Sequence, residues 1–342
     1  MDVAVEQATH ELHPPLRTAY GDVARRELFT LRLTSADGVT GRGEAAPLEA
    51  YDGVPHELVT QALERYAAVL TADGDRRTGP QLLDACREVA DLPQALAAVD
   101  LALWDAAGRR ADRPLAAMLT DAPRPDVPVN ATIGATDRAA AVQAAAAAAD
   151  AGFACVKIKV GAGDDDGRLA AIRHAVGPYV ALRIDANGAW GVDEAVEKIE
   201  ALTRHELELV EEPVSGIAEL RAVRERVAVR IAMDETAAEH GAIASGAADA
   251  VCLKLTRAGG IGALLSQAAL VRALGAEVYL ASTLDGPLGI AAALHCAAAL
   301  GVELPCGLAT LPLVGDGFGD PLPVHHGRIR LPRGAGLGDV GV

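Results

Sequence analysis

From Val127 onward, short apolar runs rich in β-branched residues alternate with amphipathic stretches of helical length. Such alternation predicts parallel strands connected by helices, and its regularity favours a (β/α)7β barrel of the TIM type. Periodicity alone leaves an open, doubly wound sheet as the alternative. The predicted strands are 127–133, 154–160, 180–185, 207–212, 228–233, 249–255, 276–282 and 303–308, and the predicted helices include 138–151, 164–176, 192–204, 236–247 and 259–274.

The first part of the chain has a different pattern. Residues 27–46 alternate apolar and polar positions around the turn 36–38, which predicts a β-hairpin. Residues 56–70 and 92–109 carry apolar residues at helical spacing. We therefore expect an N-terminal α+β domain. The predicted boundaries are 1–122 for this domain, 123–310 for the barrel and 311–342 for a C-terminal segment that returns to the first domain.

Composition narrows the classes of protein that fit. The 342 residues are 51% hydrophobic and 23% charged, as expected of a globular chain, and only 3% aromatic, so the core must be aliphatic. The formal net charge of −16 argues against a nucleic-acid partner. The longest uncharged stretch, 286–302, falls short of a membrane span and fits a buried barrel helix. Five cysteines without a CxxC pair, and no recognisable secretory signal, indicate a cytoplasmic protein with reduced thiols.

Three carboxylates stand at the ends of consecutive predicted strands: Asp185, Glu211 and Asp234. They are each about one strand-plus-helix repeat apart, so their side chains can converge at one mouth of a barrel. Carboxylates gathered without a cation repel one another, and a hard divalent ion removes the conflict. Mg²⁺ fits such oxygen ligands, and Mn²⁺ also does. Taken singly, Asp185 or Asp234 could equally be a turn residue or a helix cap.

Lysines flank these acids. Lys157 and Lys159 are two residues apart on one predicted strand, so both point to the same face, which we expect to be the lumen of the barrel. Lys254 comes from the sixth strand, across the barrel. A desolvated lysine beside a cation is suited to act as a base near neutral pH.

The combined motifs resemble the enolase superfamily, and specifically its muconate lactonizing enzyme subgroup. They are KxK at 157–159, DAN at 185–187, EEP at 211–213, DET at 234–236 and K-x-x-x-x-G-G at 254–260, and the resemblance extends to a capping domain at the N-terminus. DET departs from the commoner DES by one hydroxyl residue. The resemblance implies proton abstraction α to a carboxylate through an enediolate intermediate, with a divalent cation as cofactor.

The resemblance also implies roles residue by residue. Asp185, Glu211 and Asp234 would hold the metal. Lys159 would be the acid/base, with Lys157 adjusting its pKa and Lys254 on the opposite face of the substrate. Asn187 and Glu235 would support them, with Glu235 near Lys254. Apart from the resemblance, loops containing Tyr20 and Tyr51 are placed to close over the mouth, and we expect both tyrosines and Asp285 to bind the substrate. Ordinary packing is the alternative for the two tyrosines.

The region after the seventh predicted strand distinguishes members of the family. Residues 281–308 resemble o-succinylbenzoate synthases, whereas dipeptide epimerases usually carry Asp-x-Asp near the end of strand eight, where residues 306–310 have no acid. We therefore expect dehydration of a small carboxylate substrate by an o-succinylbenzoate synthase. The alternatives are a dipeptide epimerase, an N-succinylamino acid racemase, a muconate-type cycloisomerase and, more remotely, a non-catalytic ligand-binding barrel. Membrane partners are not expected, and association into a homo-oligomer would be compatible with the fold.

Overall fold

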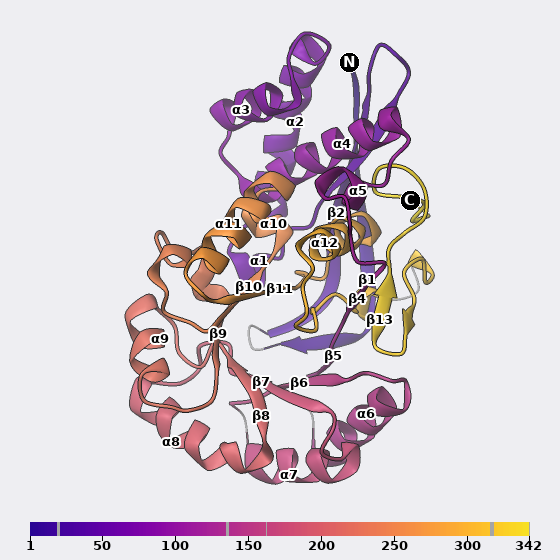
Figure 1. Ribbon diagram of the computed structural model, residues 1–342. Coiled ribbons are helices and arrows are strands. Elements are labelled where there is room, and N and C mark those ends of the chain that lie inside the picture. The colour runs from indigo at the N-terminus through magenta and orange to yellow at the C-terminus, as the bar shows by residue number, and fades with distance from the viewer. Residues whose placement is uncertain (19–20, 135–136, 162, 315–317, 342) are drawn as a thin grey trace.

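The computed structural model describes the chain except for residues 19–20, 135–136, 162, 315–317 and 342. An α+β cap lies above a barrel in Figure 1. The sheet of the cap has the antiparallel order β1-β2-β3. Its strands are β1 (Asp2–Thr18), β2 (Gly21–Thr34) and β3 (Thr40–Ala45), and its helices are α1 (Glu49–Asp52), α2 (His56–Asp73), α3 (Gly79–Val89), α4 (Pro93–Ala111) and α5 (Leu115–Leu119).

The predicted hairpin is confirmed, because β2 pairs with β3 from Thr34 opposite Thr40 onward. Helix α4 lies so close to β3 that two strand positions must be glycine. A Cβ on Gly43 would lie 1.9 Å from the carbonyl oxygen of Ala98, and one on Gly41 would lie 2.0 Å from that of Ala102. The glycines therefore set the distance between sheet and helix that fixes the body of the cap.

The predicted barrel is confirmed with one difference at its closure. Among the described residues, parallel strands follow the order β11-β10-β9-β8-β7-β6-β5. The eighth predicted strand is reduced to isolated parallel bridges, Cys306 with Val129 and Gly307 with Ala281, which join the two edges of the sheet. The strands are β5 (Ala131–Ile133), β6 (Cys155–Lys159), β7 (Ala181–Asp185), β8 (Leu207–Glu211), β9 (Ile231–Met233), β10 (Ala250–Leu253) and β11 (Glu277–Leu280).

Helices surround the barrel, except between β9 and β10. The helix predicted at 236–247 is wrong: the described residues there form two short 3-10 helices, η2 (Glu235–Ala238) and η3 (Ile243–Ser245). Gly241 and Gly246 have φ values of 82° and 61°, and such left-handed residues interrupt an α-helix. The helices are α6 (Arg138–Asp150), α7 (Asp165–Val176), α8 (Val192–Leu202), α9 (Ile217–Arg224), α10 (Leu255–Ala258), α11 (Ile261–Ala273) and α12 (Pro287–Leu300), with η1 (Thr203–His205) after α8.

The C-terminal segment contacts both parts of the molecule. After η4 (Leu311–Val314), strands β12 (Val324–His325) and β13 (Arg328–Arg330) form a small antiparallel sheet with β4 (Asp126–Pro128). Further on, the backbone N–H of Leu337 donates to Asp105 of α4 across 2.8 Å. The chain end therefore lies beside the helices of the cap (Figure 1).

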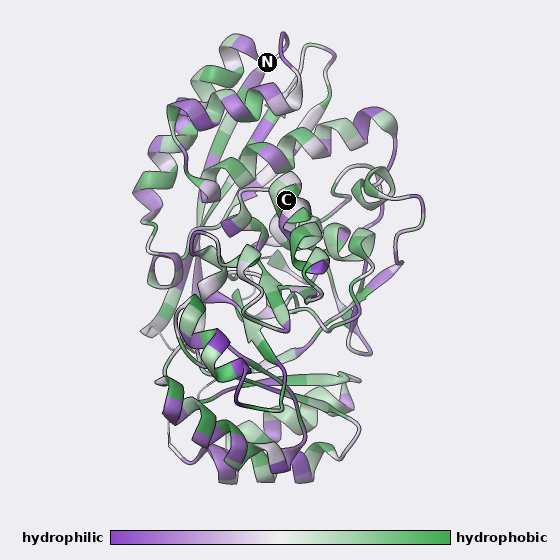
Figure 2. Cartoon of the chain, turned by 60° about the vertical axis from the view of Figure 1, so that its left-hand side comes forward, coloured by the Kyte–Doolittle hydropathy of each residue, from purple (hydrophilic) through white to green (hydrophobic). Residues whose placement is uncertain are grey.

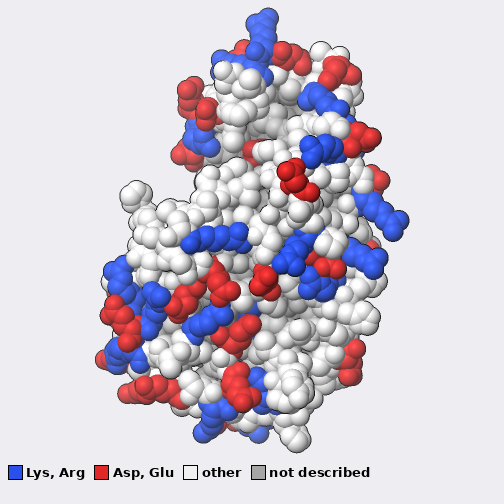
Figure 3. Space-filling view, in the orientation of Figure 1, with Lys and Arg blue, Asp and Glu red and all other residues white. Residues whose placement is uncertain are grey.

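Helix α12 carries the long uncharged stretch and is buried from Pro287 to Ala298. Figure 2 shows the central helix and strands mainly in green, whereas purple residues alternate with green on the outer helices. No helix in the described part of the chain is long and apolar enough to span a membrane. On the face shown in Figure 3, acidic and basic side chains are interspersed. That face therefore has no basic patch of the kind that nucleic acid requires.

Candidate active site

The three predicted ligand carboxylates lie at the carboxyl ends of neighbouring strands. Asp185 ends β7, Glu211 ends β8, and Asp234 follows β9. Asp185 and Glu211 are register partners, and all three side chains are buried. Glu211, Asp234 and Cys252 offer potential ligand atoms within 4.8 Å of one another. Asp185 joins Glu211 through Lys157, whose Nζ lies 3.1 Å from Asp185 and 2.8 Å from Glu211.

Lys159 lies on the same side of β6 as Lys157. Its Nζ donates to Asp185 across 2.6 Å and to Asn187 Oδ1 across 2.9 Å. The Asn187 amide in turn donates to Glu235 Oε1 across 2.9 Å. Asn187 has a φ of 47°, a left-handed conformation that asparagine tolerates better than most residues. This chain of contacts fixes the position of the Lys159 ammonium.

Lys254 directly follows β10, and three strands separate β10 from β6 in the sheet. Its ammonium contacts Asp234 and donates to the Tyr51 hydroxyl across 2.7 Å. Arg257 also donates to that hydroxyl, across 2.9 Å. Lys254 and Lys159 both line one cavity, which they reach from different sides of the barrel.

Burial and the neighbouring ammonium groups act in opposite directions on the pKa values of the three acids. It opposes ionisation of Asp185, but the ammonium groups of Lys159 and Lys157 outweigh it and hold the pKa of Asp185 below its usual value. Burial also opposes ionisation of Asp234, and Lys254 more than offsets it, so this pKa is lowered too. Burial raises the pKa of Glu211 to about 7, because Lys157 compensates only in part. The positive charge near Glu211 is therefore too small to offset its burial, and a divalent cation would supply more.

Sequence reasoning missed several residues that shape the site. Glu212 accepts the backbone N–H groups of Asp234 (2.7 Å) and Thr236 (2.9 Å), and so holds the turn that carries Asp234. The Thr236 hydroxyl also contacts Glu212, which gives the unusual third residue of DET a local function. Burial raises the pKa of Glu212 to about 8. The position of Glu212 in the EEP motif was the feature of the sequence that could have indicated its function.

Two other missed residues lie against the carboxylates. The Tyr279 hydroxyl donates to Glu211 across 2.8 Å. Cys252 lies beside Glu211 and Asp234, and burial raises the pKa of its thiol well above the usual value. In the sequence, Tyr279 and Cys252 are a single aromatic and a single cysteine on predicted strands. Nothing in that pattern indicated that they contact the carboxylates.

A cavity of about 160 Å³ opens between these lysines and the cap. Tyr51 lines it, as predicted for a capping residue, whereas Tyr20 is outside the described residues. The Asp285 carboxylate is buried in its own turn, where it accepts from the backbone N–H (3.2 Å) and hydroxyl (2.7 Å) of Thr283, and its contact with the substrate stays a prediction. The other described lining residues are Val23, Leu48, Ala50, Thr132, Gly134, Lys157, Asn187, Asp234, Ala281, Ser282, Thr283, Leu284, Gly307, Thr310 and Leu313.

Comparison with known proteins decides the family. Residues 139–340 match the enolase C-terminal domain-like family, and residues 1–120 match the N-terminal domain of mandelate racemase / muconate lactonizing enzyme. The chain belongs to the enolase superfamily. The match covers more than half of the chain, and it places the cap and the barrel in the two domains of that family. The chain is therefore an enolase-superfamily enzyme, of the lyase or isomerase kind.

Relatives within the superfamily differ in reaction. The chain is 43% identical over 222 residues to an o-succinylbenzoate synthase of Thermobifida fusca, covering 61% of this chain and 68% of the relative. It is 31% identical over 343 residues to muconate cycloisomerase 1 of Rhodococcus opacus, covering 95% and 91%. A dipeptide epimerase of Enterococcus faecalis, solved with Mg and L-Leu-L-Tyr, superposes with a TM-score of 0.86 at 28% identity, covering 98% of both chains.

Proposed function

We propose that this enzyme is an o-succinylbenzoate synthase of menaquinone biosynthesis, which dehydrates its substrate after removing a proton α to a carboxylate. The observation that carries the proposal is the lining of the cavity. Of its described residues, Asp234 is the one acid, and Lys254 already contacts it. A free ammonium group, such as that of a dipeptide, would therefore lack a counter-charge there. The Thermobifida fusca relative supports the same reaction.

We propose that Asp185, Glu211 and Asp234 hold a divalent cation, Mg²⁺ or alternatively Mn²⁺. The raised pKa of Glu211 supports this assignment, because a buried acid at this position is short of positive charge. Oxygen ligands from three neighbouring strands suit either ion. When bound, the cation would stabilise the negative charge that develops on the substrate carboxylate as the proton leaves.

The proton transfers fall to the lysines. Lys159 would remove the α proton and deliver it to the departing β-hydroxyl, which leaves as water. Lys254, on the other side of the cavity, would stabilise the enediolate by its positive charge. Lys157, held between two carboxylates, would place a second positive charge beside Lys159, and Asn187 with Glu235 would hold Lys159 in place.

Epimerisation is the second candidate function. The structural similarity to the Enterococcus faecalis epimerase extends over nearly the whole chain, and two lysines on either side of a cavity suit 1,1-proton transfer. In that reaction Lys159 and Lys254 would exchange acid and base roles. An N-succinylamino acid is a substrate of this class that presents no free ammonium, so the cavity would accept it.

The test is a direct comparison of substrates with the purified enzyme and Mg²⁺. We expect loss of the cyclohexadiene absorbance of the o-succinylbenzoate synthase substrate. Parallel reactions in D₂O with L-Ala-L-Glu and with N-succinyl amino acids report epimerisation by NMR. Epimerisation of either without dehydration of the cyclohexadiene would reject the proposed reaction. We further propose a cytoplasmic location, since the five cysteines are free and buried.

A further inference from the structure

Arg26, on β2 of the cap, is buried where the cap meets the barrel, with 2% of its surface exposed. Its guanidinium donates to backbone carbonyls of two separate segments. Ala46 (3.1 Å) and Pro47 follow β3, whereas Thr283 (3.1 Å) and Leu284 (3.2 Å) lie in the turn between β11 and α12. One side chain of the cap therefore joins a loop of the cap to a turn of the barrel.

Both segments border the substrate cavity. Leu48 lines it from the cap, and Ser282 and Leu284 line it from the barrel. Leu48 packs against the small apolar cluster that contains Leu284 and Val23. The carbon that reacts must lie within reach of the two lysines, so this apolar wall would contact a part of the substrate that does not react.

The backbone of Leu284 needs support from its surroundings. Its φ of 60° lies in the left-handed region, which is unfavourable for a residue with a branched side chain. Its carbonyl accepts from Arg26, and its N–H donates to the Ser282 hydroxyl across 3.3 Å. Asp285 accepts the N–H of Thr283 in the same turn, across 3.2 Å. Arg26 thus occupies the carbonyls of the turn, while side chains of the turn itself occupy its N–H groups.

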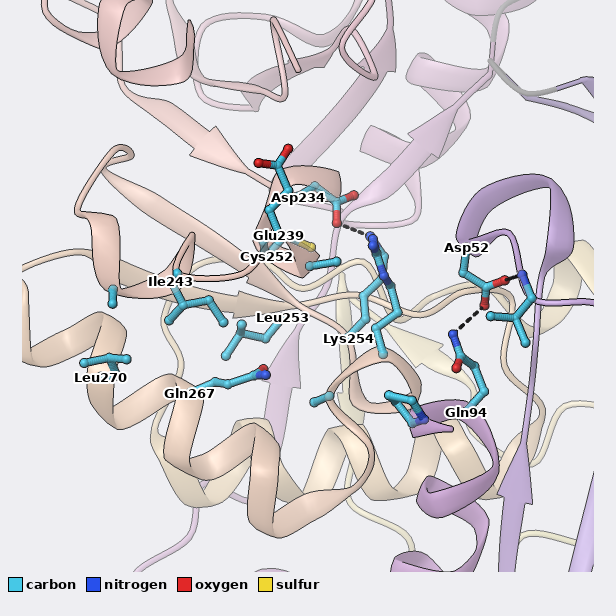
Figure 4. Close-up of a pocket in the computed structure, with 18 of the residues that line it drawn as sticks. Asp52, Gln94, Asp234, Glu239, Ile243, Cys252, Leu253, Lys254, Gln267 and Leu270 are labelled. Atoms are coloured by element: carbon cyan, nitrogen blue, oxygen red, sulfur yellow. Dashed lines mark hydrogen bonds and ion pairs between the residues drawn. The ribbon is translucent and has the colours of Figure 1, made fainter. Parts of the chain in front are cut away.

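The proposed catalytic lysines are held by contacts that do not involve Arg26. Lys254 contacts Asp234 within the barrel, as Figure 4 shows. Lys159 donates to Asp185, also within the barrel, across 2.6 Å. The loss of Arg26 should therefore change the fit of the substrate more than the geometry of proton transfer.

Helix α1, which carries Tyr51, also has supports of its own. Asp52 accepts from Gln94 of α4 across 3.1 Å, as Figure 4 shows, and from the backbone N–H of Leu48 across 3.3 Å. The loss of Arg26 should therefore loosen the segment before α1 and the turn after β11 without displacing the Tyr51 hydroxyl.

We propose that Arg26 is a positioning residue for substrate binding, which holds the loop after β3 and the turn after β11 at the separation that shapes the apolar wall of the cavity. Arg26 acts through these two segments and does not itself line the cavity. The inference rests on the proposed function only in that this cavity holds the substrate, and it is the same for dehydration and for epimerisation.

The first experiment is hydrogen–deuterium exchange of the intact enzyme without substrate. Arg26→Met keeps the aliphatic part of the side chain and removes the donors. Exchange in residues 46–48 and 282–286 should become at least about tenfold faster, whereas the barrel strands should exchange as in the wild type. Arg25→Met is the matched control, because Arg25 is the preceding residue and is exposed, and it should leave both segments unchanged.

Steady-state kinetics provides the second measurement. It uses the cyclohexadiene substrate or, where the wild type epimerises one of them instead, an N-succinyl amino acid or L-Ala-L-Glu. Arg26→Met should raise KM at least about tenfold and change kcat by less than about threefold, the pattern of lost substrate binding. A defect in folding alone would lower the fraction of active enzyme and leave KM unchanged. Arg26→Lys keeps the charge without the planar guanidinium, so its KM should be intermediate.

Three outcomes would overturn the proposal: faster exchange throughout the protein, unchanged exchange in the two segments, or a fall in kcat at constant KM. Arg26→Lys replaces Arg26→Met if the latter does not fold, and failure of both to fold would also overturn it, since Arg26 would then be required for folding. If the wild type turns over none of these substrates, the proposed function fails, and the exchange experiment still decides whether Arg26 holds the two segments.

Discussion

The ammonium of Lys254 donates a hydrogen bond to the hydroxyl of Tyr51 across 2.7 Å, which joins the barrel to the cap at the active site. The same ammonium lies 4.7 Å from the centre of the Tyr51 ring. The Tyr51 hydroxyl also donates to Asp234 across 3.0 Å. A residue of the capping domain therefore contacts both a proposed metal ligand and a proposed catalytic lysine.

Replacing Tyr51 by phenylalanine should lower turnover by about tenfold to a hundredfold, because hydrogen bonds to charged groups contribute about 1.5–3 kcal/mol. The ring remains beside Lys254, so the fold should persist. Tyr66→Phe is the matched control, since its hydroxyl bonds the Ala90 carbonyl within the cap. Steady-state kinetics and thermal melts of both variants provide the measurement. Equal activity losses in the two variants would contradict a specific function for the Tyr51 hydroxyl.

Lys159→Met should reduce turnover by about 10²–10⁴-fold, the usual contribution of a general acid/base. The control is Lys198→Met, which removes a lysine that pairs with Glu194 on the outer helix α8. Circular dichroism establishes that both variants fold. If Lys159→Met retains wild-type turnover, Lys159 is not the base.

Mg²⁺ should stabilise the wild-type protein by about 2.7 kcal/mol at a concentration one hundred times its dissociation constant. Asp234→Asn should largely lose this stabilisation, because it removes one ligand charge. Glu197→Gln, at an exposed position on α8, should keep it. Denaturant unfolding with and without Mg²⁺ measures the effect independently of activity. Equal stabilisation of all three proteins would contradict the proposed ligand.

Titration of the buried Glu44 should lower the free energy of unfolding as the pH rises from about 4.5 to about 8. Its carboxylate accepts the N–H of Gly286 at the start of α12, and burial, reinforced by Asp285, raises its pKa from 4.5 to about 8. Between these values the folded state holds a proton that the unfolded state has released, so stability falls with pH by up to about 1.4 kcal/mol per unit. Below pH 4.5 both states are protonated and this loss is absent.

The measurement for Glu44 is denaturant unfolding at a series of pH values from about 4.5 to about 8. Glu44→Gln removes the titration and should flatten the profile relative to the wild type. Glu57→Gln, at an exposed position on α2, should leave the profile unchanged. A wild-type profile that the Glu44 substitution does not alter would show that this carboxyl group does not carry the pH dependence.

The amino-acid sequence by itself determined the barrel, the cap and the placement of the acids and lysines at the strand ends. Strand alternation and one-repeat spacing are local properties of the chain, and parallel strands necessarily bring Asp185 and Glu211 to the same edge. The burial of helix α12 was also predicted from the sequence. An uncharged stretch that is too short to span a membrane is expected in the core of a protein.

Only the tertiary structure decided the contacts between distant segments. Tyr51 and Lys254 are far apart in the chain, and no periodicity relates a cap residue to a barrel lysine. The tertiary structure likewise brings Asp285 close to Glu44 and Arg26, which are far from it in the chain. The described residues after β9 do not form the predicted helix, because two left-handed glycines, Gly241 and Gly246, interrupt that stretch. The pattern of the sequence shows which face of a helix or strand is apolar. Which residues of distant segments contact one another depends on how the helices and strands pack in the folded protein.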